Sequence, residues 1–303
     1  MTLRLLPEAS TAVSQAIFLT GAMRTGTTMM ARLVGSFAGT EIFIEPPLCY
    51  VLLPLIEDLP REQWQLLFEA ALYEDCLLPA LAGRNLNLNK ADLTHILTMK
   101  EPSDVEARQR TPHKHRDLVE ASLQSRIAFK IPEMTHLAGT LSGYYPQMKM
   151  LATVRQPESV VASILIKGWF DDSTLTGPSL KWPLKSDRKF NFPFWLEPKY
   201  ESDWKTMTPI DRCCLAYIHQ YDKVDAATFN LIIDYDRFVQ DAKSDLGKIC
   251  DFFGMNFGPK TDSLLGDIRE PKKDRTLDWG KADPSLKQKM DGVYNRLVDC
   301  ALG

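Results

Sequence analysis

The residues with the clearest chemical potential lie between positions 21 and 28, where two glycines, one arginine and three threonines follow an apolar run at 17–19. A helical apolar pattern begins at Met29. A strand, a glycine-bearing turn and a helix together direct backbone amides at an anion. The segment therefore predicts an anion site whose cation is Arg24. The alternative is a tight strand-to-helix turn that binds nothing.

The two glycines of this segment can be compared with the nucleotide-binding pattern G-x-x-x-x-G-K-[ST]. Gly21 and Gly26 have the required spacing, but Thr27 stands where that pattern has lysine. Kinases and NTPases need that lysine on the terminal phosphates of the nucleotide. The loop therefore favours an anion other than ATP, and a P-loop small-molecule kinase stays open as an alternative. Magnesium-dependent ATP turnover would identify the kinase.

A second strand-to-helix junction begins at Arg155, directly after the apolar run 151–154. Pro157 suits the first turn of the following helix. Ser163 and Lys167 are four residues apart, so they are expected on one face of that helix. In a parallel sheet, Arg155 would lie at the same edge as Arg24. Two arginine-headed junctions at one edge predict a ligand with two separate anionic groups.

These two junctions resemble a known family. Arg24-Thr-Gly-Thr-Thr28 is similar to the 5′-phosphosulfate loop of sulfotransferases that use 3′-phosphoadenosine 5′-phosphosulfate (PAPS), and Arg155 to Ser163 resembles their 3′-phosphate motif. The nearest variants are the tyrosylprotein and bacterial glycolipid branches. The resemblance implies a P-loop-like α/β fold, PAPS as donor, PAP as product and no metal. It implies that the nucleotide is held by Arg24, Thr25, Gly26, Thr27, Thr28, Arg155, Ser163 and Lys167.

Three further positions take their roles from the same resemblance. Glu45 matches the general base of the two branches, where cytosolic small-molecule enzymes have histidine. Lys130 matches a lysine that contacts the transferring group, which makes Glu45, Arg24 and Lys130 the expected catalytic residues. Tyr235 matches a tyrosine that contacts the nucleotide. A basic loop with Lys272, Lys273 and Arg275 is expected near the donor as well.

Five short β-like runs organise the chain into an α/β fold. They lie at 17–20, 41–45, 126–131, 148–154 and 230–234. Helical patterns alternate with them at 61–81, 112–123, 157–166, 209–227, 241–253 and from Asp283 onward. This alternation predicts a central, mostly parallel sheet with helices on both faces. We expect residues 1–303 to form one domain.

The segment 169–204 breaks the alternation with four prolines among aromatic and charged residues. Its aromatic residues argue against disorder. A connection of this length is either a functional loop or a packed surface excursion. We expect it to cover a cleft and line the acceptor site, with the surface excursion left open.

Composition excludes several other functions. The net charge of −3 argues against nucleic-acid binding. The six cysteines lack zinc spacing, and His113 with His115 resembles a metal pair only superficially. His136 could line the acceptor site or simply pack. Apolar segments are too short for a signal peptide or a membrane span, so a cytoplasmic location is expected. The sequence gives no oligomeric state.

The sequence thus predicts transfer of a sulfuryl group from PAPS, by in-line displacement with a glutamate base. The expected acceptor is a hydroxyl of a carbohydrate, a glycolipid or another hydroxylated metabolite. Besides the kinase, a catalytically inactive nucleotide-binding module remains an alternative. A Glu45→Ala variant that binds PAP and loses turnover would exclude that module.

Overall fold

Five parallel strands form the central sheet of the protein in its computed structural model. The structure describes residues 3–177, 184–187, 189–268 and 277–302. The strands lie in the order β2-β3-β1-β4-β7. Their bounds are β1 (Ile17–Gly21), β2 (Thr40–Ile44), β3 (Arg126–Lys130), β4 (Lys149–Val154) and β7 (Leu231–Asp234). Each agrees with an expected run to within one residue at either end. The predicted α/β fold is confirmed.

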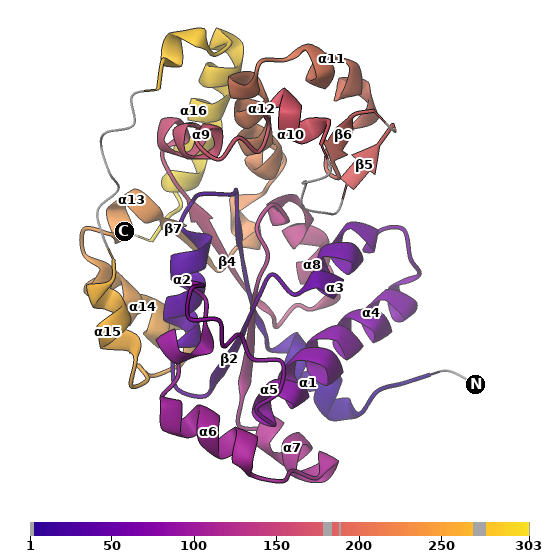
Figure 1. Ribbon diagram of the computed structural model, residues 1–303, viewed down its shortest axis with the longest axis vertical. Helices are drawn as coiled ribbons and strands as arrows, with labels where there is room; N and C mark the ends of the chain where they lie inside the picture. Colours follow the sequence, from indigo (N-terminus) through magenta and orange to yellow (C-terminus); the bar gives the residue numbers. More distant parts are fainter. Residues whose placement is uncertain (1–2, 178–183, 188, 269–276, 303) are drawn as a thin grey trace.

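Side chains of the sheet alternate between two apolar layers, as the two-residue period of a strand requires. Phe18 belongs to the larger cluster, while its neighbours Ile17 and Leu19 belong to the other. The second layer contains α2 (Thr27–Gly35), α14 (Ala242–Phe253) and α15 (Thr261–Gly266), which lie together on one side of the molecule (Figure 1). All five strands are therefore sandwiched between helices, with their carboxyl ends at one edge.

Helices of the larger layer come from all parts of the chain. They are α1 (Pro7–Ser14), α3 (Pro47–Leu52), α4 (Arg61–Glu69), α5 (Leu78–Leu81), α7 (His115–Ser122), α8 (Ala138–Tyr144), α9 (Pro157–Leu165), α12 (Pro209–Tyr221) and α16 (Pro284–Val298). The expected helix at 61–81 is helical throughout, but residues Ala70–Leu77 widen into a π-helix. Two further short helices are α6 (Pro102–Arg110) and α13 (Tyr235–Phe238).

The segment 169–204 packs through its aromatic side chains. It contains α10 (Asp172–Leu175), the antiparallel pair β5 (Leu184–Ser186) and β6 (Asn191–Pro193), and the start of α11 (Glu201–Thr206). Phe192, Trp195 and Trp204 are buried in the larger apolar cluster. Figure 1 shows this segment beside α12, at the end of the molecule that also holds α9 and α16.

Candidate functional site

The loop after β1 is fixed by hydrogen bonds to the end of β4. The Thr25 hydroxyl donates to the Ala22 carbonyl at 2.7 Å and lies 2.8 Å from the Thr153 hydroxyl. The buried Tyr221 hydroxyl accepts from the Ala22 amide at 2.6 Å and donates to the Thr153 carbonyl at 2.7 Å. A Cβ on Gly21 would stand 2.6 Å from that carbonyl, so only glycine fits there. These hydrogen bonds to β4 and α12 thus fix the conformation of the loop.

Gly26 ends the loop and begins α2 in the left-handed region, with φ +89°. A Cβ at this position would stand 2.1 Å from the Tyr235 ring, so the ring packs directly on the glycine backbone. No side chain caps this helix start, and the first amides of α2 have no helical partner. Burial raises the pKa of Tyr235, so its phenol stays neutral. The result is a helix terminus with open amides beside a phenol ring, which is the geometry that the predicted anion site requires.

The two arginine-headed junctions meet. The Arg24 side chain donates through Nε to the Ser163 hydroxyl at 2.9 Å, joining the loop to α9. The Arg155 guanidinium donates through Nη1 to the Arg24 carbonyl at 3.4 Å. Arg24 also lies over the Trp169 ring, with 5.9 Å from Cζ to the ring centroid. The structure therefore brings Arg24, Arg155 and Ser163 together, although they are up to 139 positions apart.

An acidic partner orients Arg155. Its Nε donates to Asp236 at 3.0 Å, and the other carboxylate oxygen of Asp236 accepts from the Gln156 amide at 3.0 Å. The guanidinium lies over the Tyr235 ring, 5.9 Å from Cζ to its centroid. Asp236 thus fixes both the arginine and the start of α9, while leaving the Nη2 side of the fork to other contacts. The sequence reasoning missed this residue.

Glu45 and Lys130 form an ion pair at the ends of the neighbouring strands β2 and β3. The Lys130 ammonium lies 2.5 Å from Glu45 Oε1 and donates to the Thr28 hydroxyl at 3.3 Å. The lysine side chain is 2% exposed and the glutamate side chain 31% exposed. Lys130 therefore connects the predicted base to the first turn of α2, at the predicted anion site.

Three residues at this edge have positive φ although none is glycine. Arg24 has φ +69°, Glu45 +55° and Glu133 +64°. A left-handed conformation costs a non-glycine residue roughly 1–3 kcal/mol, and such strain is concentrated at active sites and ligand clamps. Each of the three stands just beyond the carboxyl end of its strand, β1, β2 or β3 respectively. This coincidence supports the edge as the functional centre.

Glu133 is a second carboxylate that the sequence reasoning did not identify. Its amide donates to the Gly21 carbonyl at 3.0 Å, and its side chain accepts from the Trp195 indole at 3.2 Å. Burial raises the pKa of the Tyr50 phenol, and the negative charges of Glu45 and Glu133 raise it further. The Tyr50 phenol therefore stays neutral in the field of these two carboxylates. The signal in the sequence is the position of Glu133, three residues after Lys130.

Four of the residues expected to bind the nucleotide are not placed at the site by the described structure. Lys167 does not share a helix face with Ser163, because α9 ends at Leu165 and the Lys167 amide closes a tight turn onto the Ile164 carbonyl at 2.9 Å. Its side chain is exposed. The basic residues Lys272, Lys273 and Arg275 lie outside the described residues. Their role stays a prediction.

Among the residues that the structure describes, no group of three or more His, Cys, Asp or Glu side chains is placed to hold a metal ion. His113 bonds the Arg108 carbonyl, and His115 is exposed beside Glu74. His136 packs against His219, with 4.6 Å between the ring centroids, and its role in lining the acceptor site stays a prediction.

No helix in the described part of the chain is both long and apolar enough to cross a membrane. The expected cytoplasmic location stays a prediction.

Three solved structures show a distant similarity to this chain. Among solved structures, sulfotransferase STF9 from Mycobacterium avium shares 14% identity, covering 97% of this chain and 78% of its own, with a TM-score of 0.47. STF1 from Mycobacterium tuberculosis H37Rv shares 16%, covering 94% and 81%, with a TM-score of 0.42. The sulfotransferase domain of the Synechococcus PCC 7002 olefin synthase shares 18%, covering 94% and 92%, with a TM-score of 0.43.

A search of curated proteins found no match. The sulfotransferase family, by contrast, matches residues 16–181, which include Arg24, Glu45, Lys130, Arg155 and Ser163. This match spans more than half of the sequence, and the chain belongs to the sulfotransferase family.

Proposed function

We propose that this sulfotransferase transfers a sulfuryl group to an acceptor hydroxyl, with Glu45 as the base. Family membership implies PAPS as the donor. When bound, PAPS supplies the sulfuryl group for in-line transfer to the acceptor oxygen. The remaining steps belong to residues of this chain.

The donor end of the site has the chemistry that a doubly anionic nucleotide requires. The open amides of α2 and the Arg24 guanidinium would hold the phosphosulfate end. Arg155 and the Ser163 hydroxyl would hold the 3′-phosphate, since a guanidinium fork suits phosphate and Asp236 presets its plane. Because Gly26 has no Cβ, the Tyr235 ring packs on its backbone, where it would form one wall of the nucleotide site. Thr25, Thr27 and Thr28 complete this cradle.

The acceptor end centres on the Glu45–Lys130 pair. Glu45 Oε accepts the proton of the acceptor hydroxyl, a role that contributes typically ~10²–10⁴-fold in rate. The Lys130 ammonium pairs with the carboxylate and neutralises charge that develops on the transferring group. Tyr50 and Glu133 provide a neutral donor and an acceptor for further polar groups of the substrate. A hydroxylated metabolite, carbohydrate or glycolipid head group has the matching chemistry.

The segment 169–204 borders this acceptor end. Trp195 contacts Glu133, and Trp169 lies against Arg24, so the segment contacts both halves of the site. We assign to it the exclusion of water and the covering of the acceptor, as one domain with the remainder of the chain.

The observation that carries this proposal is the contact of Lys130 with both Glu45 and Thr28, which joins the base to the anion site. The test combines calorimetric titration with PAP and transfer from radiolabelled PAPS to a panel of small alcohols, phenols and glycosides. Wild type should bind PAP in preference to ATP and label at least one acceptor.

Two variants separate the roles. Glu45→Gln should lose turnover by about 10²-fold or more while PAP affinity stays within twofold, because the amide cannot accept the proton. Glu62→Gln, an exposed glutamate on α4, is the matched control and should retain full activity. Full turnover by Glu45→Gln would show that Glu45 is not the base. Binding of ATP without binding of PAP would show that PAPS is not the donor.

A further inference from the structure

The last helix, α16, carries a phenol on its buried face. The buried residues of this helix recur at spacings of three and four, and they are Met290, Val293, Tyr294 and Leu297. Tyr294 is 7% exposed, and a phenol at this depth normally finds a hydrogen-bond partner. The Tyr294 hydroxyl donates to a carboxylate oxygen of Asp234 at 3.1 Å. The helix is therefore joined to the end of β7 by a polar contact inside the apolar layer.

Asp234 connects this phenol to α13. It is the last residue of β7 and the N-cap of α13, and its second carboxylate oxygen accepts from the Asp236 amide at 3.1 Å. Burial raises the pKa of the Asp234 carboxyl, while the hydrogen bonds from Tyr294 and from the Asp236 amide lower it. Burial and the charge of Asp234 raise the pKa of Tyr294, so the phenol keeps its proton and acts as the donor. Tyr294 thus satisfies one oxygen of a buried carboxyl group.

The same chain of contacts continues to the second junction. The Asp236 amide is bound by Asp234, and the Asp236 carboxylate accepts from Arg155 Nε at 3.0 Å. From Tyr294 to Arg155, no hydrogen bond in this chain is longer than 3.1 Å. The orientation of the Arg155 guanidinium therefore depends on groups that reach back to α16.

The backbone of Arg155 is fixed by a different residue. Tyr217, on α12, is fully buried and donates through its hydroxyl to the Arg155 carbonyl at 3.0 Å. The contacts that start at Tyr294 reach only the side chain of Arg155. Loss of the Tyr294 hydroxyl should consequently loosen the guanidinium and leave the start of α9 in place.

We propose that Tyr294 is a positioning residue for the donor, which acts through Asp234 and Asp236 to hold the Arg155 fork in the plane that receives a 3′-phosphate. A fork that is already oriented loses less side-chain freedom when the phosphate binds. The inference rests on the proposed function, which assigns Arg155 to the 3′-phosphate. It requires that Tyr294 affect only nucleotides that carry this phosphate.

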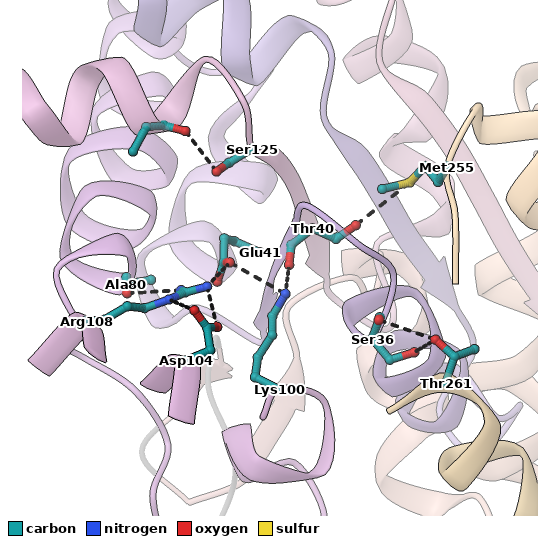
Figure 2. Close-up of polar contacts among 11 residues, drawn as sticks. Ser36, Thr40, Glu41, Ala80, Lys100, Asp104, Arg108, Ser125, Met255 and Thr261 are labelled. Atoms are coloured by element: carbon teal, nitrogen blue, oxygen red, sulfur yellow. Dashed lines mark hydrogen bonds and ion pairs between the residues drawn. The ribbon is translucent and has the colours of Figure 1, made fainter. Parts of the chain in front are cut away.

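A second buried carboxylate lies on the opposite edge strand of the sheet, β2. Figure 2 shows Glu41 between Arg108, at 2.9 Å, and Lys100, at 3.6 Å. Glu41 is near the amino end of β2, so this network is remote from the edge that holds Arg155. Arg108→Met breaks one of its pairs and should lower stability without altering the donor site. This variant shows what a loss of stability alone does to nucleotide binding.

The experiment compares PAP with adenosine 5′-monophosphate (AMP), which differs from PAP only in lacking the 3′-phosphate. Calorimetric titration of Tyr294→Phe should show PAP affinity lowered about threefold to tenfold, the range for one hydrogen bond, and AMP affinity within twofold of wild type. Tyr145→Phe is the matched control, because the buried Tyr145 hydroxyl donates to Glu69 at 3.2 Å and lies far from the donor in the fold. Equal losses for PAP and AMP, or unchanged PAP affinity, would overturn the proposal.

Combined variants test the path of the effect. In the Arg155→Ala background, Tyr294→Phe should cause no further loss of PAP affinity, because its target is gone. A further loss as large as in wild type would show that Tyr294 acts on another group. Asp234→Ser keeps an acceptor for the Asp236 amide and removes the carboxylate that Tyr294 binds. It should give a similar PAP-specific loss, and it supplies the same test should Tyr294→Phe not fold.

Wild type separates this inference from the function on which it rests. A preference of about tenfold or more for PAP over AMP is expected from the assignment of Arg155. Equal binding of the two nucleotides by wild type would contradict that assignment itself. A preference that survives Tyr294→Phe would overturn only the role of Tyr294. A PAP-specific loss in Arg108→Met would also overturn it, since the preference would then follow stability.

Discussion

The ammonium group of Lys130 lies 2.5 Å from a carboxylate oxygen of Glu45 and also reaches the Thr28 hydroxyl. This lysine ends β3 and contacts both the residue that follows β2 and the first turn of α2, the helix that follows β1. Its side chain is almost wholly buried, so its charge depends on these partners for stabilisation.

Replacing Lys130 by methionine should affect both stability and catalysis. The change leaves the Glu45 carboxylate without its cation, and with Glu45 partly exposed the expected loss is about 2 kcal/mol, below the cost of breaking a fully buried pair. Chemical denaturation measures that loss, and transfer from PAPS measures turnover. The double variant Lys130→Met with Glu45→Leu should regain stability but not turnover. Recovery of turnover in the double variant would contradict the assigned roles.

Arg155→Ala should weaken PAP binding by about 1–3 kcal/mol, the range for a charged hydrogen bond. Arg155→Lys should fall between this variant and wild type, because it keeps the charge and loses the fork that Asp236 orients. Calorimetric titration provides the affinities. Arg110→Ala, which breaks an exposed ion pair, is the control and should bind PAP normally. An unchanged affinity in Arg155→Ala would remove this residue from the donor site.

Gly26→Ala should destabilise the protein by roughly 1–3 kcal/mol, because φ +89° is strained for alanine and the new Cβ would stand 2.1 Å from the Tyr235 ring. Adding Tyr235→Ala should recover part of the melting temperature by removing the clash, while the backbone strain stays. Gly247→Ala on α14 has open space around it and should not destabilise. Equal melting temperatures for Gly26→Ala and Gly247→Ala would contradict the packing described.

Stability should rise with pH between about pH 4 and pH 6. Burial lowers the pKa of His136 to about 3, with the charge of His219 adding to the effect, and burial lowers that of His219 to about 4. Both are neutral in the folded protein and bind protons when unfolded below pH 6.5, so acid favours unfolding by up to ~1.4 kcal/mol per pH unit for each histidine. Denaturation across this range measures the slope, and His136→Phe should reduce it. A slope unchanged in His136→Phe would place the proton uptake elsewhere.

The sheet could be predicted because each strand is a short apolar run that ends at a residue with distinct chemistry, such as Gly21 or Arg155. Parallel pairing then places those ends at one edge, which is why Arg24 and Arg155 could be expected together before any geometry was available.

The features that could not be predicted from the sequence depend on contacts between residues far apart in the chain. Asp236 is 81 positions from Arg155, and nothing in its own neighbourhood indicates the pairing. Lys167 was expected on the same helix face as Ser163 although the helical pattern ended at 166, and α9 ends at Leu165. The helix α6 was not expected, since it buries only Val105, and the π-helical widening at Ala70–Leu77 has no separate period in the sequence.

Tyr221 ties Ala22 of the loop to the Thr153 carbonyl through one buried hydroxyl. The Ala22 amide proton can exchange with solvent only when α12 and the loop separate. The hydrogen–deuterium exchange rate of this amide therefore reports the free energy of opening the loop that would bind the nucleotide. The exchange should become slower when a nucleotide binds to the other side of the loop and stabilises it.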